Sequence, residues 1–165
     1  MPTSKIHSAI PYGFDSRHIL VECDTNRGLP TLNIVGMAGK SIEESRDRIR
    51  AAIKNSGFRF PSDKVVVNLA PAELRKAGTQ LDLPISLAIL TSSNQLSSDL
   101  LTDSAFVGEL ALTGELRPIP GIINIIESAL KHHFRHLFIP EGNRAQAAPF
   151  ANRVRIYPVA SLRAV

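Results

Sequence analysis

The segment Gly36-Met-Ala-Gly-Lys-Ser41 contains residue types that bind phosphate, because backbone amides of a glycine-rich turn and a following lysine can surround an anion. It lies between an expected strand and an expected helix, where phosphate-binding loops usually lie. The pattern GxxxxGK[ST] requires its first glycine at position 34, which is Ile34. The loop is therefore too short to surround a triphosphate. We expect no nucleotide site; instead Ser41 caps the following helix, beside a solvated Lys40.

Five histidines are the next candidates for acid–base or metal chemistry. His132, His133 and His136 lie near the end of an expected helix, where positive charge complements the helix dipole. We favour that electrostatic role over metal binding. His7 and His18 are expected to lie singly on strands. The sequence has no CxxC pair and no cluster of histidine with cysteine, so it predicts no metal site.

Serine and carboxylate patterns do not indicate a hydrolase either. The nucleophile motif GxSxG is absent from the sequence. Ser86 and Ser92 fall inside an expected apolar helix, where packing and backbone hydrogen bonds account for them. Glu109 and Glu115 are separated by an expected tight turn, and a surface position explains them more simply than a catalytic pair does. We therefore assign no catalytic residue from these patterns.

The composition is that of one globular domain, with 165 residues of which 44% are hydrophobic and 21% charged. The net charge of +4 permits an anionic partner, but aromatic residues are only 5% and tryptophan is absent, so base stacking is not expected. The single cysteine, Cys23, fits a reducing cytoplasm. Apolar stretches fall short of the ~20 residues that span a membrane, and the first residues lack a signal-peptide pattern.

Strand and helix signals alternate along the chain and predict an α+β fold. Alternating and β-branched runs predict strands at 6–12, 18–24, 32–35, 64–69, 106–110, 112–116, 136–139 and 154–157. The first three are expected to form a meander. The fourth is apolar enough to be a buried central strand, and the fifth and sixth are expected to form a tight pair.

Helix periodicity and turn residues predict helices at 42–55, from 82 to at least 90, at 121–133, at 143–148 and from Ser161 onward. Ser41 and Glu44 have the spacing of a capping box. Asp82 is expected to cap the second helix, with Pro84 in its first turn. This helix is so apolar that it must be covered on most sides. The last helix has only about one turn, which suggests a domain of a longer polypeptide.

Two segments resemble the parts of Lon-type peptidases that carry the catalytic serine and lysine. They are residues 76–84, KAGTQLDLP, and residues 108–121, GELALTGELRPIPG. When the Lon pattern is laid over them without insertion, the serine falls on Gln80 and the lysine on Ile123. A glutamine amide is no nucleophile at neutral pH, and isoleucine cannot accept a proton, so Ser/Lys catalysis loses both groups. The resemblance implies a Lon-like site without its catalyst.

Further motifs in the same order extend the resemblance to the whole chain: IVG at 34–36, EESRDR at 43–48 and VNLAP at 67–71. The chain resembles the N-terminal domain of the ComM/YifB family of magnesium-chelatase-like AAA+ proteins. Residues 108–118 also resemble the Lon-like domain of RadA recombination proteins, which lacks peptidase activity. The resemblance implies one domain over residues 1–165, with the two-layer fold of Lon protease domains and ribosomal S5 domain 2, in which a mixed sheet packs against helices.

The same resemblance implies a larger cytoplasmic protein. A downstream AAA+ module, not contained in this chain, would bind ATP and Mg and form a homo-hexameric ring that moves branched DNA during natural transformation. The domain itself is expected to bind no cofactor and no membrane. It would be a non-enzymatic module that helps to assemble the ring and contacts DNA.

Basic residues on glycine- or proline-bounded loops are the candidate phosphate contacts, because a long side chain can reach outward from such a loop. They are Lys40, Arg75, Lys76 and Arg117. Simple solvation of these side chains is the alternative. Two other functions stay open, namely an active Ser/Lys peptidase with displaced residues and an accessory domain of a metal chelatase, although the sequence shows no porphyrin or magnesium site.

Overall fold

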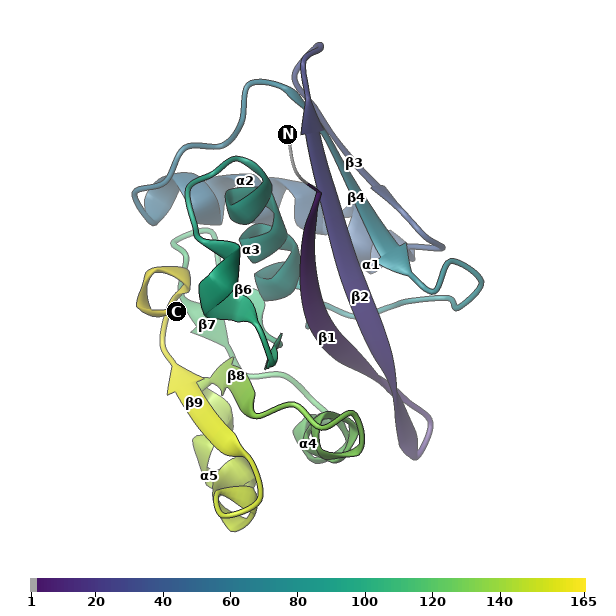
Figure 1. Cartoon of the computed structure of the whole chain (residues 1–165), viewed down its shortest axis with the longest axis vertical. Helices are drawn as coiled ribbons and strands as arrows, with labels where there is room; N and C mark the ends of the chain where they lie inside the picture. The colour runs from purple at the N-terminus through teal and green to yellow at the C-terminus, as the bar shows by residue number, and fades with distance from the viewer. Residues whose placement is uncertain (1–2) are drawn as a thin grey trace.

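The computed structural model describes residues 3–165 and every side chain among them except that of Leu100. Within these residues a mixed seven-stranded sheet has the order β3-β4-β2-β1-β5-β8-β9 (Figure 1). Its strands are β1 Ser4–Tyr12, β2 Asp15–Asn26, β3 Thr31–Val35, β4 Lys64–Ala70, β5 Ser104–Phe106, β8 His136–Pro140 and β9 Arg155–Val159. β2 runs antiparallel to both β1 and β4, and the other neighbours are parallel.

The predicted meander of the first three strands is wrong. β3 pairs in parallel with β4, and β4 lies between β3 and β2. The chain between β3 and β4 forms helices, and a helical crossover joins parallel neighbours where a short turn cannot. β4 is a central strand as predicted, since its residues Val65, Val67 and Leu69 are fully buried.

The helices are α1 Lys40–Glu43, α2 Ser45–Asn55, α3 Asp82–Ser92, α4 Ile122–Lys131 and α5 Arg144–Ala147. The predicted helix 42–55 is therefore divided at Glu44. Short 3-10 turns occupy Ser98–Leu101, Glu141–Asn143, Ala148–Phe150 and Leu162–Ala164. The last turn starts as predicted, because the Ser161 hydroxyl accepts a hydrogen bond from the Ala164 amide at 3.2 Å.

The predicted tight strand pair is only partly correct. β6 Glu109–Leu110 and β7 Leu116–Arg117 form a separate two-stranded sheet, shorter than expected. The residues before them, in β5, belong to the main sheet instead and pair in parallel with β1 and β8. Gly108 lies between β5 and β6, and a Cβ atom there would lie 2.6 Å from the Leu116 side chain.

Helices cover both faces of the sheet, so the expected two-layer arrangement is wrong for part of it. In β1, Ile6 and Ile10 belong to the core that contains α2 and α3, whereas Ala9 belongs to a second core with α4 and α5. Alternate residues of a strand point to opposite faces, which places the two sets of helices on opposite sides. Figure 1 shows α4 and α5 at the end of the molecule away from α2.

Helix α3 is the centre of the larger core, and all eleven of its residues are buried. It packs against β1, β2 and α2. The two serines inside it are satisfied by the helix backbone, since Ser86 donates to the Asp82 carbonyl at 2.9 Å and Ser92 to the Ile89 carbonyl at 3.0 Å. The prediction of a covered helix with structural serines is confirmed.

Candidate functional site

The structure brings the two Lon-like segments into direct contact through their backbones. The Gly108 amide donates to the Gln80 carbonyl at 2.9 Å, and the Leu83 amide donates to the Gly108 carbonyl at 3.0 Å. These two bonds attach the start of α3 to the chain between β5 and β6. The segments 76–84 and 108–121 therefore form one structural unit, which we call the paired-motif site.

Asp82 joins three elements at this site. Its carboxylate accepts from Arg48 on α2 at 3.1 and 3.2 Å and from the Leu110 amide of β6 at 3.1 Å. Burial raises the pKa of Asp82 to about 6, against the lowering effects of Arg48 and the Leu110 amide. The carboxylate is thus ionised at pH 7 and forms a bidentate ion pair with Arg48.

The predicted capping role of Asp82 is wrong. Asp82 is the first residue of α3, the N-cap position is Leu81, and no side chain caps this helix. The carboxylate instead accepts from Arg48 and the Leu110 amide. Pro84 does lie in the first turn, where its missing amide hydrogen leaves no hydrogen bond unmade.

Gln80, on which the Lon serine falls in the sequence alignment, has a structural role. Its side chain is buried, and its amide nitrogen donates to the Ala77 carbonyl at 2.8 Å, which closes the turn before α3. Gly78 has a φ of +94°, and a Cβ atom there would lie 2.3 Å from the Gln80 amide oxygen. Ile123, at the position of the Lon lysine, is an exposed residue in the first turn of α4.

The two glutamates of the predicted strand pair have different environments. Glu109 accepts from the Thr79 hydroxyl at 2.7 Å and so adds a further link between the two motif segments. Glu115 is exposed, and it forms an isolated backbone bridge to Ser161. These contacts give both residues a structural explanation.

Lys76 does not extend into solvent, so the prediction that it reaches outward to phosphate is wrong. Its side chain is 0% exposed, and its ammonium donates to the Gly36 carbonyl at 2.6 Å and to the Pro71 carbonyl. Burial lowers the pKa of Lys76. The ammonium joins the loop after β3 to the loop after β4, and it is not available to an external anion.

The backbone of Lys76 joins the same two loops. Its amide donates to the Met37 carbonyl at 3.1 Å, and its carbonyl accepts from the Gly39 amide at 2.9 Å. A Cβ atom on Gly39 would lie 2.8 Å from the Lys76 carbonyl oxygen, so only glycine allows this approach. The loop that resembled a phosphate-binding loop therefore contains a glycine, Gly39, whose amide is already hydrogen-bonded to the Lys76 carbonyl.

Ser41 takes part in this contact and does not cap a helix. Its hydroxyl accepts from the Gly78 amide at 2.9 Å, whereas the N-cap position of α1 is Gly39. The predicted capping box with Glu44 is therefore wrong. The hydroxyl is engaged by the neighbouring loop, and Glu44 occupies the break between α1 and α2.

The other three candidate phosphate contacts are exposed, but they lie in two places. The Lys40 side chain is 89% exposed, and its ammonium is 4.0 Å from Glu44. Arg75 is exposed on the facing loop, because the backbone bridge between Ala38 and Lys76 joins the two loops. Arg117 is exposed on β7, which lies on the other side of α3 from α1 in Figure 1.

Three histidines form a cluster that the sequence did not predict. His7 Nδ1 lies 2.9 Å from His18 Nε2, and the rings of His18 and His132 stack with their centroids 4.9 Å apart. The expectation that His7 and His18 lie singly is wrong, because the β1–β2 register places Ala9 opposite His18 and His7 opposite Leu20.

His132 lies at the end of α4, where its Nδ1 is 2.9 Å from the Ser128 carbonyl. His136 instead lies 2.9 Å from the Tyr157 hydroxyl. Across residues 3–165, no group of three or more histidine, cysteine, aspartate and glutamate side chains could hold a metal ion. The histidine cluster is accordingly interpreted as a packed, hydrogen-bonded group.

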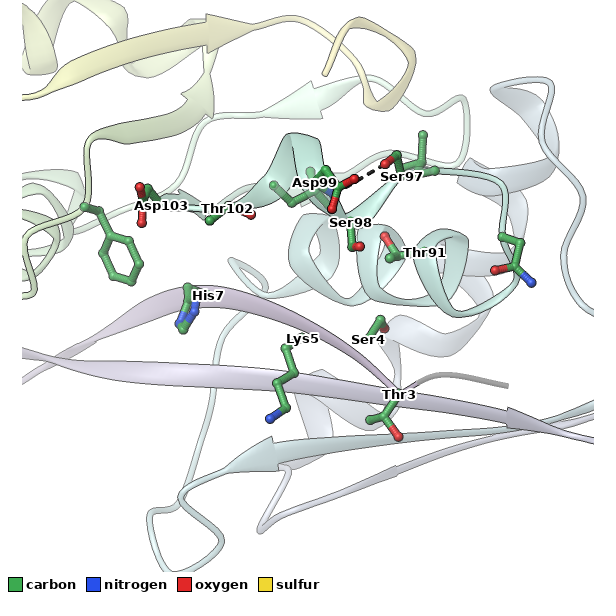
Figure 2. A pocket seen from close by; sticks show the side chains of 14 residues that line it. Thr3, Ser4, Lys5, His7, Thr91, Ser97, Ser98, Asp99, Thr102 and Asp103 are labelled. Atoms are coloured by element: carbon green, nitrogen blue, oxygen red, sulfur yellow. Dashed lines mark hydrogen bonds between the residues drawn. The ribbon is translucent and has the colours of Figure 1, made fainter.

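A hollow of about 570 Å³ lies between β1 and the residues after α3 (Figure 2). Lys5 and His7 line it from the strand, while Asp99 and Asp103 line it from the opposite segment. Its charged groups are of both signs, so it has no clear preference for an anion. It includes none of the residues of the two Lon-like segments.

The class of protein follows from a family match. The family described as Subunit ChlI of Mg-chelatase matches residues 21–143, which include both Lon-like segments. The chain belongs to this family. In the described part of the chain, no helix has the length and apolar character required to cross a membrane.

Three individual proteins are similar to this chain over most of its length. The chain is 44% identical to the protein YifB of Escherichia coli K12 over 131 residues, which are 79% of this chain and 26% of YifB. It is 38% identical to the competence protein ComM of Haemophilus influenzae over 148 residues, which are 90% of this chain and 29% of ComM. It is 29% identical to the DNA repair protein RadA of H. influenzae over 109 residues, which are 65% of this chain and 23% of RadA. The chain thus spans less than a third of these relatives.

The histidine cluster predicts loss of stability in acid. Burial, with the nearby charges of His7 and His132, lowers the pKa of His18 to about 4 from its ordinary 6.5. The unfolded chain therefore binds a proton at His18 below pH ~6.5, whereas the folded chain binds it only near pH ~4. The stability that comes from keeping His18 neutral is present above pH ~6.5 and is lost as the pH falls toward ~4.

Urea unfolding of the wild type and of His18→Gln at pH 7.5 and pH 4.5 tests this expectation. The wild type should lose more unfolding free energy between these pH values than His18→Gln, because glutamine does not titrate. Asp82 has a raised pKa, so its contribution to stability changes with pH in the opposite direction. This contribution is the same in both proteins and does not affect their difference. His133→Gln, at an exposed position, is the control and should behave as the wild type. Equal losses in His18→Gln and wild type would contradict the prediction.

Proposed function

We propose that this chain is a non-catalytic Lon-like domain of a magnesium-chelatase-like AAA+ protein that acts in DNA processing. The single observation that carries the non-catalytic part is the structural use of Gln80, whose buried amide closes the turn where the Lon serine would lie. The paired-motif site is filled by interactions that stabilise the fold. The α+β architecture with a mixed sheet supports assignment to the Lon and S5 fold, with an additional layer of helices.

The names of two relatives support the DNA-processing part. ComM is a competence protein and RadA is a DNA repair protein, and this chain is similar to one segment of each. In our proposal the remainder of the parent protein supplies an AAA+ module that binds ATP and Mg, forms a hexameric ring in the cytoplasm and moves branched DNA. The domain described here assists ring assembly and contacts DNA.

The proposed DNA contacts are the candidates that are exposed, namely Lys40, Arg75 and Arg117. Lys76 is withdrawn from this set because its ammonium is buried and bound to backbone carbonyls. Lys40 and Arg75 lie on facing loops and can approach one phosphate backbone together, whereas Arg117 would contact DNA from a second position. Electrostatic contact of this kind is independent of base sequence.

The proposed DNA contact predicts binding that weakens with salt. The 165-residue chain should bind a labelled DNA duplex at micromolar or lower Kd in low salt, measured by filter binding. Arg75→Gln should weaken binding and reduce the slope of log K against log salt by about 1, because one phosphate contact is lost. Lys54→Gln, which changes an exposed cation at the end of α2, is the matched control. Failure to bind in the micromolar range at low salt would remove the DNA-contact role.

The proposed lack of catalysis predicts no peptidase activity. The wild-type chain should neither hydrolyse casein nor become labelled by a serine-directed fluorophosphonate, because the nucleophile position is Gln80 and the base position is Ile123. Mass spectrometry of the probe-treated chain would detect labelling of a displaced serine. A labelled serine together with casein cleavage, both abolished by alanine at that serine, would show instead that the chain is an active peptidase.

A further inference from the structure

The β1–β2 hairpin ends in an aromatic side chain that nothing in the described structure covers. Phe14 lies at the turn between the strands and has a relative exposure of 106%, so its ring is open to solvent on both faces. Gly13 precedes it with a φ of +60°, which lets the chain reverse there. Figure 1 shows the hairpin end projecting beyond the sheet, near α4.

A second aromatic ring and an arginine belong to the same hairpin end. The Arg17 guanidinium is 4.6 Å from the centroid of the Tyr12 ring, and the same guanidinium pairs with Asp15 at 3.3 Å. The composition argued against base stacking, but the fold places two of the nine aromatic residues, seven Phe and two Tyr, at one hairpin end. Phe14 remains the ring with free faces.

A hollow of about 410 Å³ adjoins the hairpin end and contains cations from two other elements. Its lining includes Asp15, Ser16, Glu127, Lys131, His132 and Arg153. Two carboxylates oppose the two permanent cations of the lining, but Asp15 is paired with Arg17. Together with Arg17, which pairs with Asp15 beside the hollow, the group contains three cations and two carboxylates. An anionic group is therefore favoured beside Phe14.

We infer that this hairpin end binds a nucleotide unit of single-stranded DNA, with the base stacked on Phe14 and the adjacent phosphate near Lys131 and Arg153. The inference rests on the proposed DNA-processing function and adds a contact distinct from Lys40, Arg75 and Arg117. A flat ring with open faces and nearby cations matches the stacking and backbone contacts of single-strand binding.

A single strand fits this surface better than a duplex or a protein partner. The faces of duplex bases are already covered by their neighbours, whereas an unpaired base can stack on a side chain. A protein partner would require a broader apolar patch, but the hollow beside the hairpin end is lined mainly by polar and charged residues. The surface offers one ring with open faces and one hollow whose lining includes Lys131 and Arg153.

Two oligomers of the same length test the inference, namely labelled thymidine 20-mer and an abasic 20-mer that retains the phosphates. Fluorescence anisotropy with the 165-residue chain should show tighter binding of the thymidine oligomer. Phe14→Ala should weaken that binding by about fivefold or more, because one stacked base contributes ~1–3 kcal/mol. The same substitution should leave abasic binding unchanged, and Phe14→Trp should retain the preference for bases.

The controls separate this inference from the proposed function. Leu29→Ala removes another exposed apolar side chain, 83% exposed and outside the hairpin end, and should behave as the wild type. Lys131→Gln should weaken both oligomers and reduce the salt slope. Equal binding of both oligomers by the wild type, or unchanged binding by Phe14→Ala, would overturn the inference while salt-dependent DNA binding through Arg75 still stands. Absence of binding to any DNA would overturn both.

Discussion

The buried ammonium of Lys76 is the interaction on which the arrangement of the paired-motif site depends. Removing a lysine from water costs several kcal/mol unless hydrogen bonds replace its hydration. Here two backbone carbonyls replace it, those of Gly36 and Pro71, and they come from the loops after β3 and β4. The ammonium therefore holds together two loops that the sheet alone would leave independent, and the turn that leads into α3 starts from this point.

The consequence is a site whose polar groups stabilise the fold. Gln80 closes the turn, and Asp82 joins α3 to α2 and β6 through Arg48 and the Leu110 amide. In an active Ser/Lys peptidase the corresponding groups must remain free to attack a substrate and to transfer a proton. Here Gln80, at the serine position of the sequence alignment, is buried and hydrogen-bonded, so its side chain stabilises the fold.

Much of the fold could be predicted from the sequence because periodicity is a local signal. The central strand β4 and the buried helix α3 follow from their apolar runs, and the motif alignment singles out residues 76–84 and 108–121, which the structure brings into contact. The sequence could not predict contacts that depend on distant parts of the chain. Lys76 has the same local appearance as exposed Lys40, and only the approach of the loop after β3 distinguishes them. Likewise, Ser41 bonds a distant amide instead of its own helix, and the strand register unites His7 with His18.

The measurement that tests this account most directly is the unfolding free energy of Lys76→Met beside that of Lys40→Met, determined in urea at pH 7. Methionine has an unbranched side chain of similar length to that of lysine, but it leaves the Gly36 and Pro71 carbonyls without their hydrogen-bond donor. The account predicts a loss of about 2–4 kcal/mol for Lys76→Met, since each buried unsatisfied group costs ~1–3 kcal/mol. Lys40→Met, at an exposed position, should change stability by less than about 0.5 kcal/mol. Equal stability of Lys76→Met and the wild type would contradict the central role of the buried ammonium.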